Sequence, residues 1–194
     1  PALGREMEVT VVAPKFGRMH KFPGVKYYRF KTLPIQVGDI NFCAPNYFTI
    51  KNIVRKNDII FSQTIGPLGS SAIIAASKLE KPIVHYVHSI DWELAAKSIK
   101  RGRAITYKVA KRYTRYVYSK CTTLLVPART IERTLNRAKI KTNTVLCPLG
   151  VNTKVFEPST PSNSKPKSKS LPIIGFVGRV AREKDLITLY RAFR

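Results

Sequence analysis

The chain has 194 residues, of which 44% are hydrophobic and 10% aromatic, so it can bury a sizeable core and wholesale disorder is excluded. Its 35 Lys and Arg residues against 11 Asp and Glu give a formal net charge of +24. No apolar run approaches the roughly 18–20 residues that a membrane span requires, so any contact with a membrane is expected to be peripheral.

An excess of positive charge this large indicates anionic partners. Nucleic acid, anionic lipid headgroups and phosphorylated substrates all fit, and a generally basic proteome would explain the excess without any site. The three cysteines, Cys43, Cys121 and Cys147, form no Cys-x-x-Cys pair, and the three histidines are also scattered. We therefore expect no zinc or other metal site, no disulfide framework, and a reducing, cytoplasmic location.

The first half of the chain alternates between strand and helix patterns. Residues 8–13, closed by Pro14, are expected to form a buried strand. Residues 24–31 alternate between apolar and polar side chains, are bounded by Pro23 and Pro34, and are expected to form a second strand. Residues 35–56 are ambiguous, apart from an expected helix near their end. The remaining expectations are helices over 48–55 and 71–79, a strand over 58–62, and a turn over 65–70.

The second half continues the alternation. The segment 82–88 is apolar apart from its histidines, which is typical of a strand covered on both faces. Strands separated by helical patterns of 10–15 residues predict a doubly wound, Rossmann-like parallel sheet in an α/β fold. The further expectations are a long helical region over 92–119, a helix over 129–137, and strands over 122–126 and 143–147.

A change in composition predicts a domain boundary. Residues 157–170 are rich in Pro, Ser and Lys, so we expect a solvated linker there. Residues 1–156 would form the first domain, and residues 171–194 the first strand–helix unit of a second. Residues 1–12 resemble the end of a helix and a following strand, and the chain stops one or two turns into the helix after Lys184, so it is expected to be truncated at both ends.

Two strand ends carry candidate site residues. Ligands of open α/β sheets sit at the carboxyl ends of strands, where His88 follows an apolar run and could donate to a substrate oxygen. A loop histidine bonded to a backbone carbonyl is the structural alternative, and His85, in mid-strand, is expected to be structural. Gly66 and Gly69 could cradle a phosphate, although a tight turn explains them equally well.

The segment Lys97–Lys120 contains nine basic residues and no acidic one. Its apolar residues, Ile99, Ile105, Val109, Tyr113, Tyr116 and Val117, could form one helical face. That pattern predicts either a membrane-surface helix or a solvated helix packed on its own sheet. No nucleic-acid-reading module accompanies the charge, so no specific nucleic acid is expected.

The last residues carry the strongest pattern. An apolar run over 172–178 ends in Gly178-Arg179, and Lys184 precedes an amphipathic helix. A guanidinium and an ammonium beside a helix N-terminus can neutralise the two phosphates of a nucleotide leaving group. The alternative is an ordinary charged turn.

Two segments together carry a family resemblance. Residues 174–186 read Ile-Gly-Phe-Val-Gly-Arg-Val-Ala-Arg-Glu-Lys-Asp-Leu, and residues 145–158 read Val-Leu-Cys-Pro-Leu-Gly-Val-Asn-Thr-Lys-Val-Phe-Glu-Pro. They resemble the Gly-Arg–Glu-Lys segment and the interdomain segment of the retaining glycosyltransferases of family 4, which have the two-domain GT-B fold. Asn152 stands where that family usually has Asp, and Asp185 where it usually has Gly.

The resemblance implies an enzyme that moves a hexose from a nucleotide-diphosphate sugar to a hydroxyl of a lipid or glycan, with retention and without a metal or other cofactor. Arg179 and Lys184 would grip the donor diphosphate, and His88 would lie near the transferred sugar as the catalytic residue. Gly150 and Gly178 would let the backbone approach the cleft. The paired glutamates of the family would lie beyond Arg194, so the fragment is expected to be inactive alone.

Two alternatives to a transferase remain at this point. The first is a non-enzymatic binder of an anionic membrane surface or nucleic acid through the basic helix. The second is a GT-B relative of different chemistry, such as an epimerase or a phosphorylase.

Overall fold

The computed structural model describes residues 6–37, 40–99, 101–157, 174–178, 180 and 184–193. The chain divides into two compact units, Pro1–Gly150 and Val151–Arg194, and each is described by itself. This division falls after Gly150. The domain limits that the sequence predicts, at 156 and 170, stay predictions.

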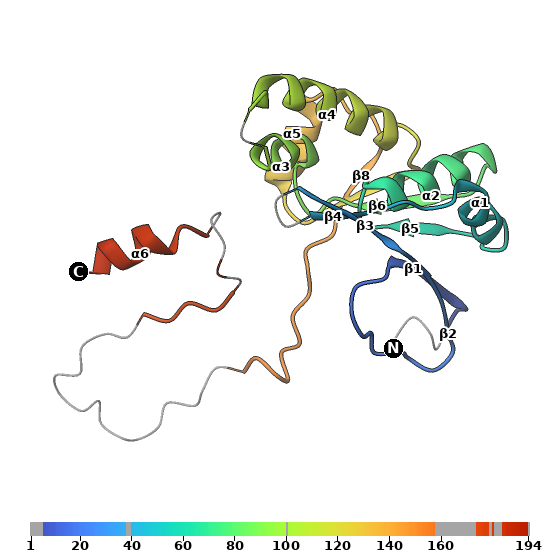
Figure 1. The fold of residues 1–194 in the computed structure, drawn as a ribbon, viewed down its shortest axis with the longest axis horizontal. Coiled ribbons are helices and arrows are strands. Elements are labelled where there is room, and N and C mark those ends of the chain that lie inside the picture. The colour runs from blue at the N-terminus through green and yellow to red at the C-terminus, as the bar shows by residue number, and fades with distance from the viewer. Residues whose placement is uncertain are drawn as a thin grey trace. The chain divides into compact units, whose positions relative to one another are not determined.

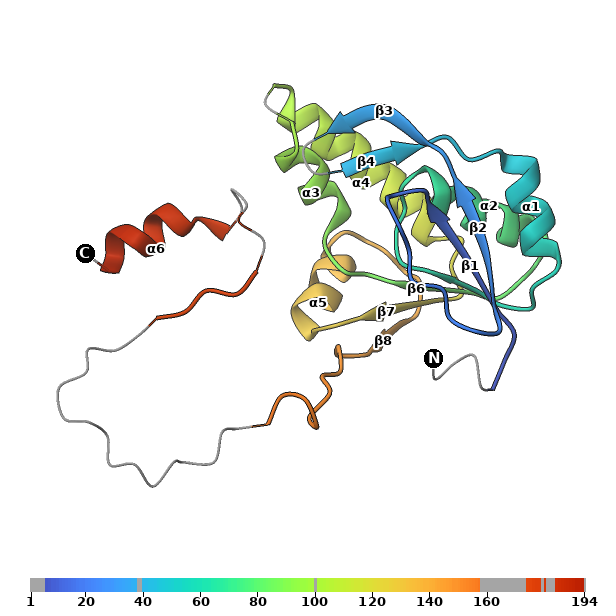
Figure 2. The same ribbon diagram turned by 60° about the horizontal axis from the view of Figure 1, so that its bottom comes forward.

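A four-stranded parallel sheet forms the centre of the first unit (Figure 1). Its strands follow chain order as β5, β6, β7 and β8, and Figure 2 shows β6, β7 and β8 side by side. Ser62 of β5 pairs with His85 of β6, which pairs with Leu124 of β7. The predicted α/β fold with a parallel sheet is confirmed. The strands are β5 (Ile60–Ser62), β6 (Ile83–Tyr86), β7 (Thr123–Val126) and β8 (Thr144–Leu146).

Helices precede and connect these strands: one comes before β5, and the others link one parallel strand to the next, as parallel pairing requires. The Asn46 side chain caps the first of them by accepting a hydrogen bond from the backbone N–H of Thr49 at 3.1 Å. Pro67, whose fixed φ suits a first helical residue, begins the second. The helices are α1 (Tyr47–Arg55), α2 (Pro67–Lys78), α3 (Asp91–Lys97), α4 (Arg103–Tyr118) and α5 (Arg129–Arg137).

The core lies where these helices meet the central sheet. Ile83 and Leu124 contribute from the strands, and Ile73, Val117 and Leu135 contribute from three helices. Each is buried to 1% exposure or less. Burying a side chain of this size contributes about 1.5–3 kcal/mol, so this cluster supplies much of the driving force for folding.

Four further strands stand outside the central sheet among the described residues. The predicted strands over 8–13 and 24–31 form β1 (Val9–Pro14) and β2 (Val25–Phe30), a separate parallel pair. An antiparallel hairpin of β3 (Thr32–Val37) and β4 (Ile40–Cys43) begins just before the ambiguous segment 35–56 and extends into it. Pro34 and Gly38 interrupt its apolar pattern, which is why the sequence did not predict it.

The predicted long helix over 92–119 is two helices. α3 ends at Lys97 and α4 begins at Arg103, directly after Gly102. Gly102 has φ 73°, in the left-handed region that glycine enters without steric cost. α3 and α4 lie side by side in Figure 1 and pack against each other.

The second unit contains helix α6 (Leu186–Phe193). Residues 174–177, within the strand expected over 172–178, are not in a strand, which corrects that expectation. A β-strand exists only when a neighbour satisfies its backbone groups, and the described part of this unit supplies no neighbouring strand. Residues 158–173, which include most of the predicted linker, lie outside the described residues. None of the described helices is long and apolar enough to cross a bilayer.

Candidate active site

The carboxyl ends of β5 and β6 meet at one edge of the central sheet, where open α/β sheets bind ligands. Gln63 directly follows β5, and His88 lies two residues after β6. The structure brings these side chains together, with Nε2 of His88 3.3 Å from Oε1 of Gln63. His88 is exposed, and its ring centroid lies 4.6 Å from that of Tyr86.

This pairing decides what His88 can do. With Oε1 of Gln63 as the acceptor, the pairing favours the His88 tautomer that carries its proton on Nε2, and Nδ1 of that tautomer can accept a hydrogen bond from a ligand. The Tyr86 ring limits the orientations of the imidazole. The structural alternative of a histidine satisfied by a backbone carbonyl is not what the structure shows, because the partner is a side chain on the neighbouring strand end.

A polar cluster lies beside His88. Asp91 is the first residue of α3, and the hydroxyl of Tyr118, at the end of α4, donates to its Oδ2 at 2.5 Å. The Tyr118 ring centroid lies 5.0 Å from that of His85. Burial raises the pKa of Asp91, while the Tyr118 hydrogen bond and the nearby His88 act in the opposite direction. The site thus contains a partly buried carboxyl group that the Tyr118 hydroxyl holds in place.

His85 belongs to the core beneath this cluster. It is 1% exposed, and burial, with a smaller effect of His88, lowers its pKa to about 4. Its Nδ1 atom has no partner among the described residues. His85 is therefore neutral at pH 7, which agrees with the expected structural role.

The turn before α2 is explained by packing. A Cβ atom at Gly69 would lie 1.7 Å from the carbonyl oxygen of Thr64, so only glycine fits there. The N–H of Gly66 donates to Oγ1 of Thr64 at 3.1 Å, and the Ser70 hydroxyl donates to the carbonyl of Ile65 at 2.6 Å. Of the two interpretations of these glycines, the structure supports the tight turn.

The remaining predicted site residues lie near or within the second unit. Gly150 is exposed, and no atom within 4 Å would meet an added Cβ. Gly178 and Lys184 are exposed, and Arg179 lies outside the described residues. The roles of these four residues and of His88 stay predictions.

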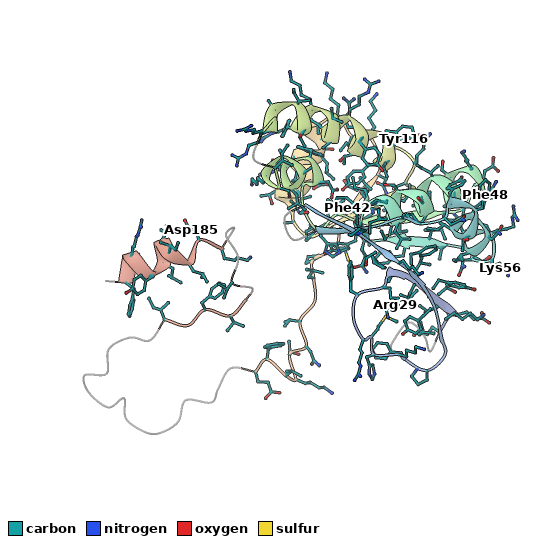
Figure 3. The ribbon with its side chains drawn as sticks, in the orientation of Figure 1. Arg29, Phe42, Phe48, Lys56, Tyr116 and Asp185 are labelled. Carbon is teal, nitrogen blue, oxygen red and sulfur yellow. The ribbon has the colours of Figure 1, made fainter. Side chains whose placement is uncertain are left out.

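The two departures from the family pattern have local explanations. Asn152 accepts a hydrogen bond from the N–H of Lys154 at 3.0 Å through Oδ1, which is the turn geometry that an aspartate would also support. Asp185 has φ 46°, in the left-handed region where glycine costs least. Its carboxylate accepts a hydrogen bond from the Thr188 hydroxyl at 2.8 Å at the start of α6; Figure 3 labels Asp185.

The apolar face expected on the long basic helix does not pack on the sheet as a unit. Val117 is fully buried, whereas Ile105, Val109, Tyr113 and Tyr116 form an exposed stripe along α4, with Tyr116 labelled in Figure 3. The buried face of α4 consists instead of Thr114, Val117 and Tyr118. We call Ile105, Val109, Tyr113 and Tyr116 the α4 stripe.

Metal-binding and thiol chemistry find little support in the described part of the chain. No three His, Cys, Asp or Glu side chains there are grouped closely enough to hold a metal ion. Cys43 and Cys121 are buried free thiols, and burial raises the pKa of Cys121 to about 12. Such a thiol is unreactive at neutral pH.

Comparison with known protein families matches residues 2–155 to Glycosyltransferase Family 4. No curated protein matches the chain. The matched region contains the whole central sheet and the edge that carries His88 and Gln63. The parallel sheet, its carboxyl edge and this match lead to one conclusion: the chain belongs to glycosyltransferase family 4.

Proposed function

We propose that the chain supplies the acceptor side of a retaining hexosyltransferase, which moves a hexose from a nucleotide-diphosphate sugar to a hydroxyl of a lipid or glycan. The observation that carries the proposal is His88 at the carboxyl edge of the sheet, paired with Gln63 at 3.3 Å. A donor and acceptor held at this edge can be oriented for chemistry at neutral pH.

The second unit would supply the positive charges that the leaving group needs. Arg179 and Lys184 would stabilise the negative charge that develops on the departing diphosphate, as fixed cations do in a water-poor site. His88 would form a hydrogen bond near the reacting centre. Gly150 and Gly178, which lack a Cβ atom, would let the backbone approach the sugar closely. In this proposal the donor is a co-substrate, and neither a metal nor another cofactor is needed.

The proposed acceptor side accounts for the surface of α4. A lipid acceptor would place the enzyme at the inner face of a membrane, in the cytoplasm, with the basic segment Lys97–Lys120 near anionic headgroups. Each Lys or Arg near such a surface contributes about 1 kcal/mol of attraction. Exposed apolar side chains in the α4 stripe would add hydrophobic contact.

The same surface favours a second candidate. A non-enzymatic binder of anionic membranes would need only the α4 stripe and its basic flanks. In that case the fold would be a scaffold, and the residues at the carboxyl edge would be dispensable for binding.

The deciding experiment assays the protein encoded by the full reading frame with a panel of nucleotide-diphosphate hexoses. Arg179→Ala and Lys184→Ala should each lower kcat by about 100-fold or more, because each removes a cation that stabilises the leaving group. Lys56→Ala, which removes an equal charge from an exposed position after α1, should leave kcat unchanged. No turnover, or turnover that ignores the first two variants, would favour the membrane-binding candidate.

A further inference from the structure

A pocket of about 440 Å³ opens between the last turns of α4 and the segment that joins α5 to β8. Four cations line it: Arg112 and Arg115 from α4, and Lys139 and Lys141 from the connecting segment. Its volume lies within the roughly 300–1,000 Å³ typical of small-molecule sites. We call it the basic pocket.

Within the part of the chain that the structure describes, the four cations have no acidic partner. Lys26–Glu8 and Lys97–Glu93 are the ion pairs found among the described residues, and neither involves the basic pocket. Like charges gathered around one cavity repel one another unless an anion neutralises them. A protein that keeps them together without a carboxylate therefore has a site prepared for a negative ligand.

Helix dipoles do not account for this charge. The pocket lies at the C-terminal ends of α4 and α5, and each helix end carries about −0.5 charge, so the two together offset about one of the four cations. The carbonyls of the last turn of α4 are already paired. Tyr118 accepts from the N–H of Cys121 at 3.0 Å and from the Thr142 hydroxyl at 2.8 Å, and Tyr116 accepts from the Ser119 hydroxyl at 2.8 Å.

The lining also fixes which groups can bind. The hydroxyls of Ser119 and Thr142 already donate to α4 carbonyls. The groups that can bind an anion are therefore the cations and the Tyr116 hydroxyl. Lys120 lies 5.3 Å from the centroid of the Tyr116 ring and adds charge beside the pocket. Ile140 is 6% exposed and anchors the connecting segment to the core.

The basic pocket is remote from the candidate active site. Ser119 precedes β7, and Thr142 precedes β8, so the pocket lies at the amino edge of the parallel sheet. His88 follows β6 at the carboxyl edge. Strands of about four residues separate the two edges by roughly 13 Å. A ligand in the basic pocket would therefore not be the reacting sugar.

We propose that the basic pocket binds the phosphate group of an anionic ligand, as a second site of the protein that is independent of donor binding. Two guanidinium groups can grip phosphate oxygens bidentately, and the lysines supply further charge. An adjoining apolar hollow, which shares Arg112 and Tyr116 with the pocket and is otherwise lined by Val109 and Tyr113, can receive an apolar part of the same ligand. The phosphate can come from a lipid headgroup or from a soluble molecule.

The variant that tests the pocket is Lys139→Gly/Lys141→Gln. Lys139 has φ 58°, and the N–H groups of Lys139 and Ile140 cap α5 by donating to the carbonyls of Asn136 and Leu135. Glycine suits this left-handed cap position, so the variant should fold at least as well as the parent. The matched control is Lys56→Gln/Arg133→Gln, which removes the same charge from exposed positions after α1 and on α5, outside the pocket and outside Lys97–Lys120.

All proteins are made in an Arg179→Ala/Lys184→Ala background, because the proposed donor site would also take a diphosphate. In this background, phosphate binding at the basic pocket is measured without the proposed donor site, so a negative result for the pocket says nothing against the transferase proposal. Isothermal titration with pyrophosphate at fixed ionic strength tests a soluble source, and sedimentation with phosphatidylcholine vesicles containing phosphatidic acid tests a headgroup source. The pocket variant should bind at least about tenfold more weakly than the control, since it removes two charged contacts to the phosphate.

Loss with pyrophosphate identifies a site that takes a soluble phosphate, and loss with vesicles alone identifies a headgroup site. Both results support the basic pocket. If neither probe binds, or if the pocket variant and the control bind both probes equally, the proposal is overturned and the charge is a surface property only.

Discussion

Tyr118, the last residue of α4, donates a 2.5 Å hydrogen bond to Asp91, the first residue of α3. The bond joins the far ends of two helices that follow β6 in the chain. It lies beside His88 and above the buried ring of His85. The bond therefore ties the start of α3, three residues after His88, to a residue 27 positions further along the chain.

Tyr118→Phe should destabilise the protein by about 1–3 kcal/mol, because it leaves the partly buried carboxyl group of Asp91 without its donor. Tyr116→Phe is the matched control, since it removes a hydroxyl from an exposed ring two residues away on the same helix, and it should change stability by less than about 0.5 kcal/mol. Urea unfolding of both variants measures the difference. Equal midpoints for the two variants would show that the Tyr118–Asp91 bond adds nothing.

Stability should fall as the pH decreases below about 6.5. The pKa of His85 is about 4 in the folded protein, against an ordinary value of 6.5, so the unfolded chain takes up a proton in this window and the folded protein does not. The full difference corresponds to about 3 kcal/mol by pH 4. The raised pKa of Asp91 acts with the opposite sign above pH 3.8, because there the folded state binds the extra proton.

His85→Leu separates the two effects, since it removes the histidine and leaves Asp91 in place. Unfolding free energies of the parent and of this variant are compared between pH 4 and 7. The parent should lose stability more steeply on acidification, and parallel curves would contradict the assignment of this dependence to His85.

The sequence predicted the central sheet well because its strands are short apolar runs separated by clear helical patterns. The helix expected over 129–137 coincides with α5, and the strands expected over 58–62, 82–88, 122–126 and 143–147 each contain one of β5 to β8. The hairpin of β3 and β4 was missed because a proline and a glycine interrupt it. The strand expected over 172–178 failed because strand pattern alone supplies no pairing partner.

The site was predicted less completely for a related reason. His88 stands at a strand end that the sequence reveals, but Gln63, Asp91 and Tyr118 reach it only through the packing of other elements. The one available signal for Gln63 was its place directly after β5. The stripe on α4 was ambiguous because an amphipathic pattern does not say which of two apolar faces the core covers.

Gly69→Ala should cost about 3 kcal/mol or more, because the new methyl group would lie 1.7 Å from the Thr64 carbonyl oxygen and would force the turn before α2 apart. Gly66→Ala is the control: its nearest contact would be an ordinary 3.4 Å to the Thr64 hydroxyl, and its φ of −61° suits any residue. Thermal unfolding followed by circular dichroism compares them. A tolerated Gly69→Ala would contradict the close packing of this turn.

The protein should sediment with vesicles that contain anionic lipid and not with neutral ones, if the α4 stripe and its basic flanks form a membrane-docking face. Ile105→Gln/Val109→Gln should then weaken vesicle binding by about tenfold, because it removes two apolar side chains that would enter the interface. These side chains are 71% and 62% exposed, so the change should leave stability within about 0.5 kcal/mol.

The matched control for this experiment is Ile59→Gln, which removes a 54% exposed apolar side chain before β5, away from α4. It should bind anionic vesicles as the parent does. Raising the salt concentration should weaken binding of the parent and of the control alike, since the attraction between the basic flanks and the headgroups is screened. Equal loss in the control, or parent binding that ignores lipid charge, would exclude docking through the α4 stripe and would leave its exposure without a membrane function.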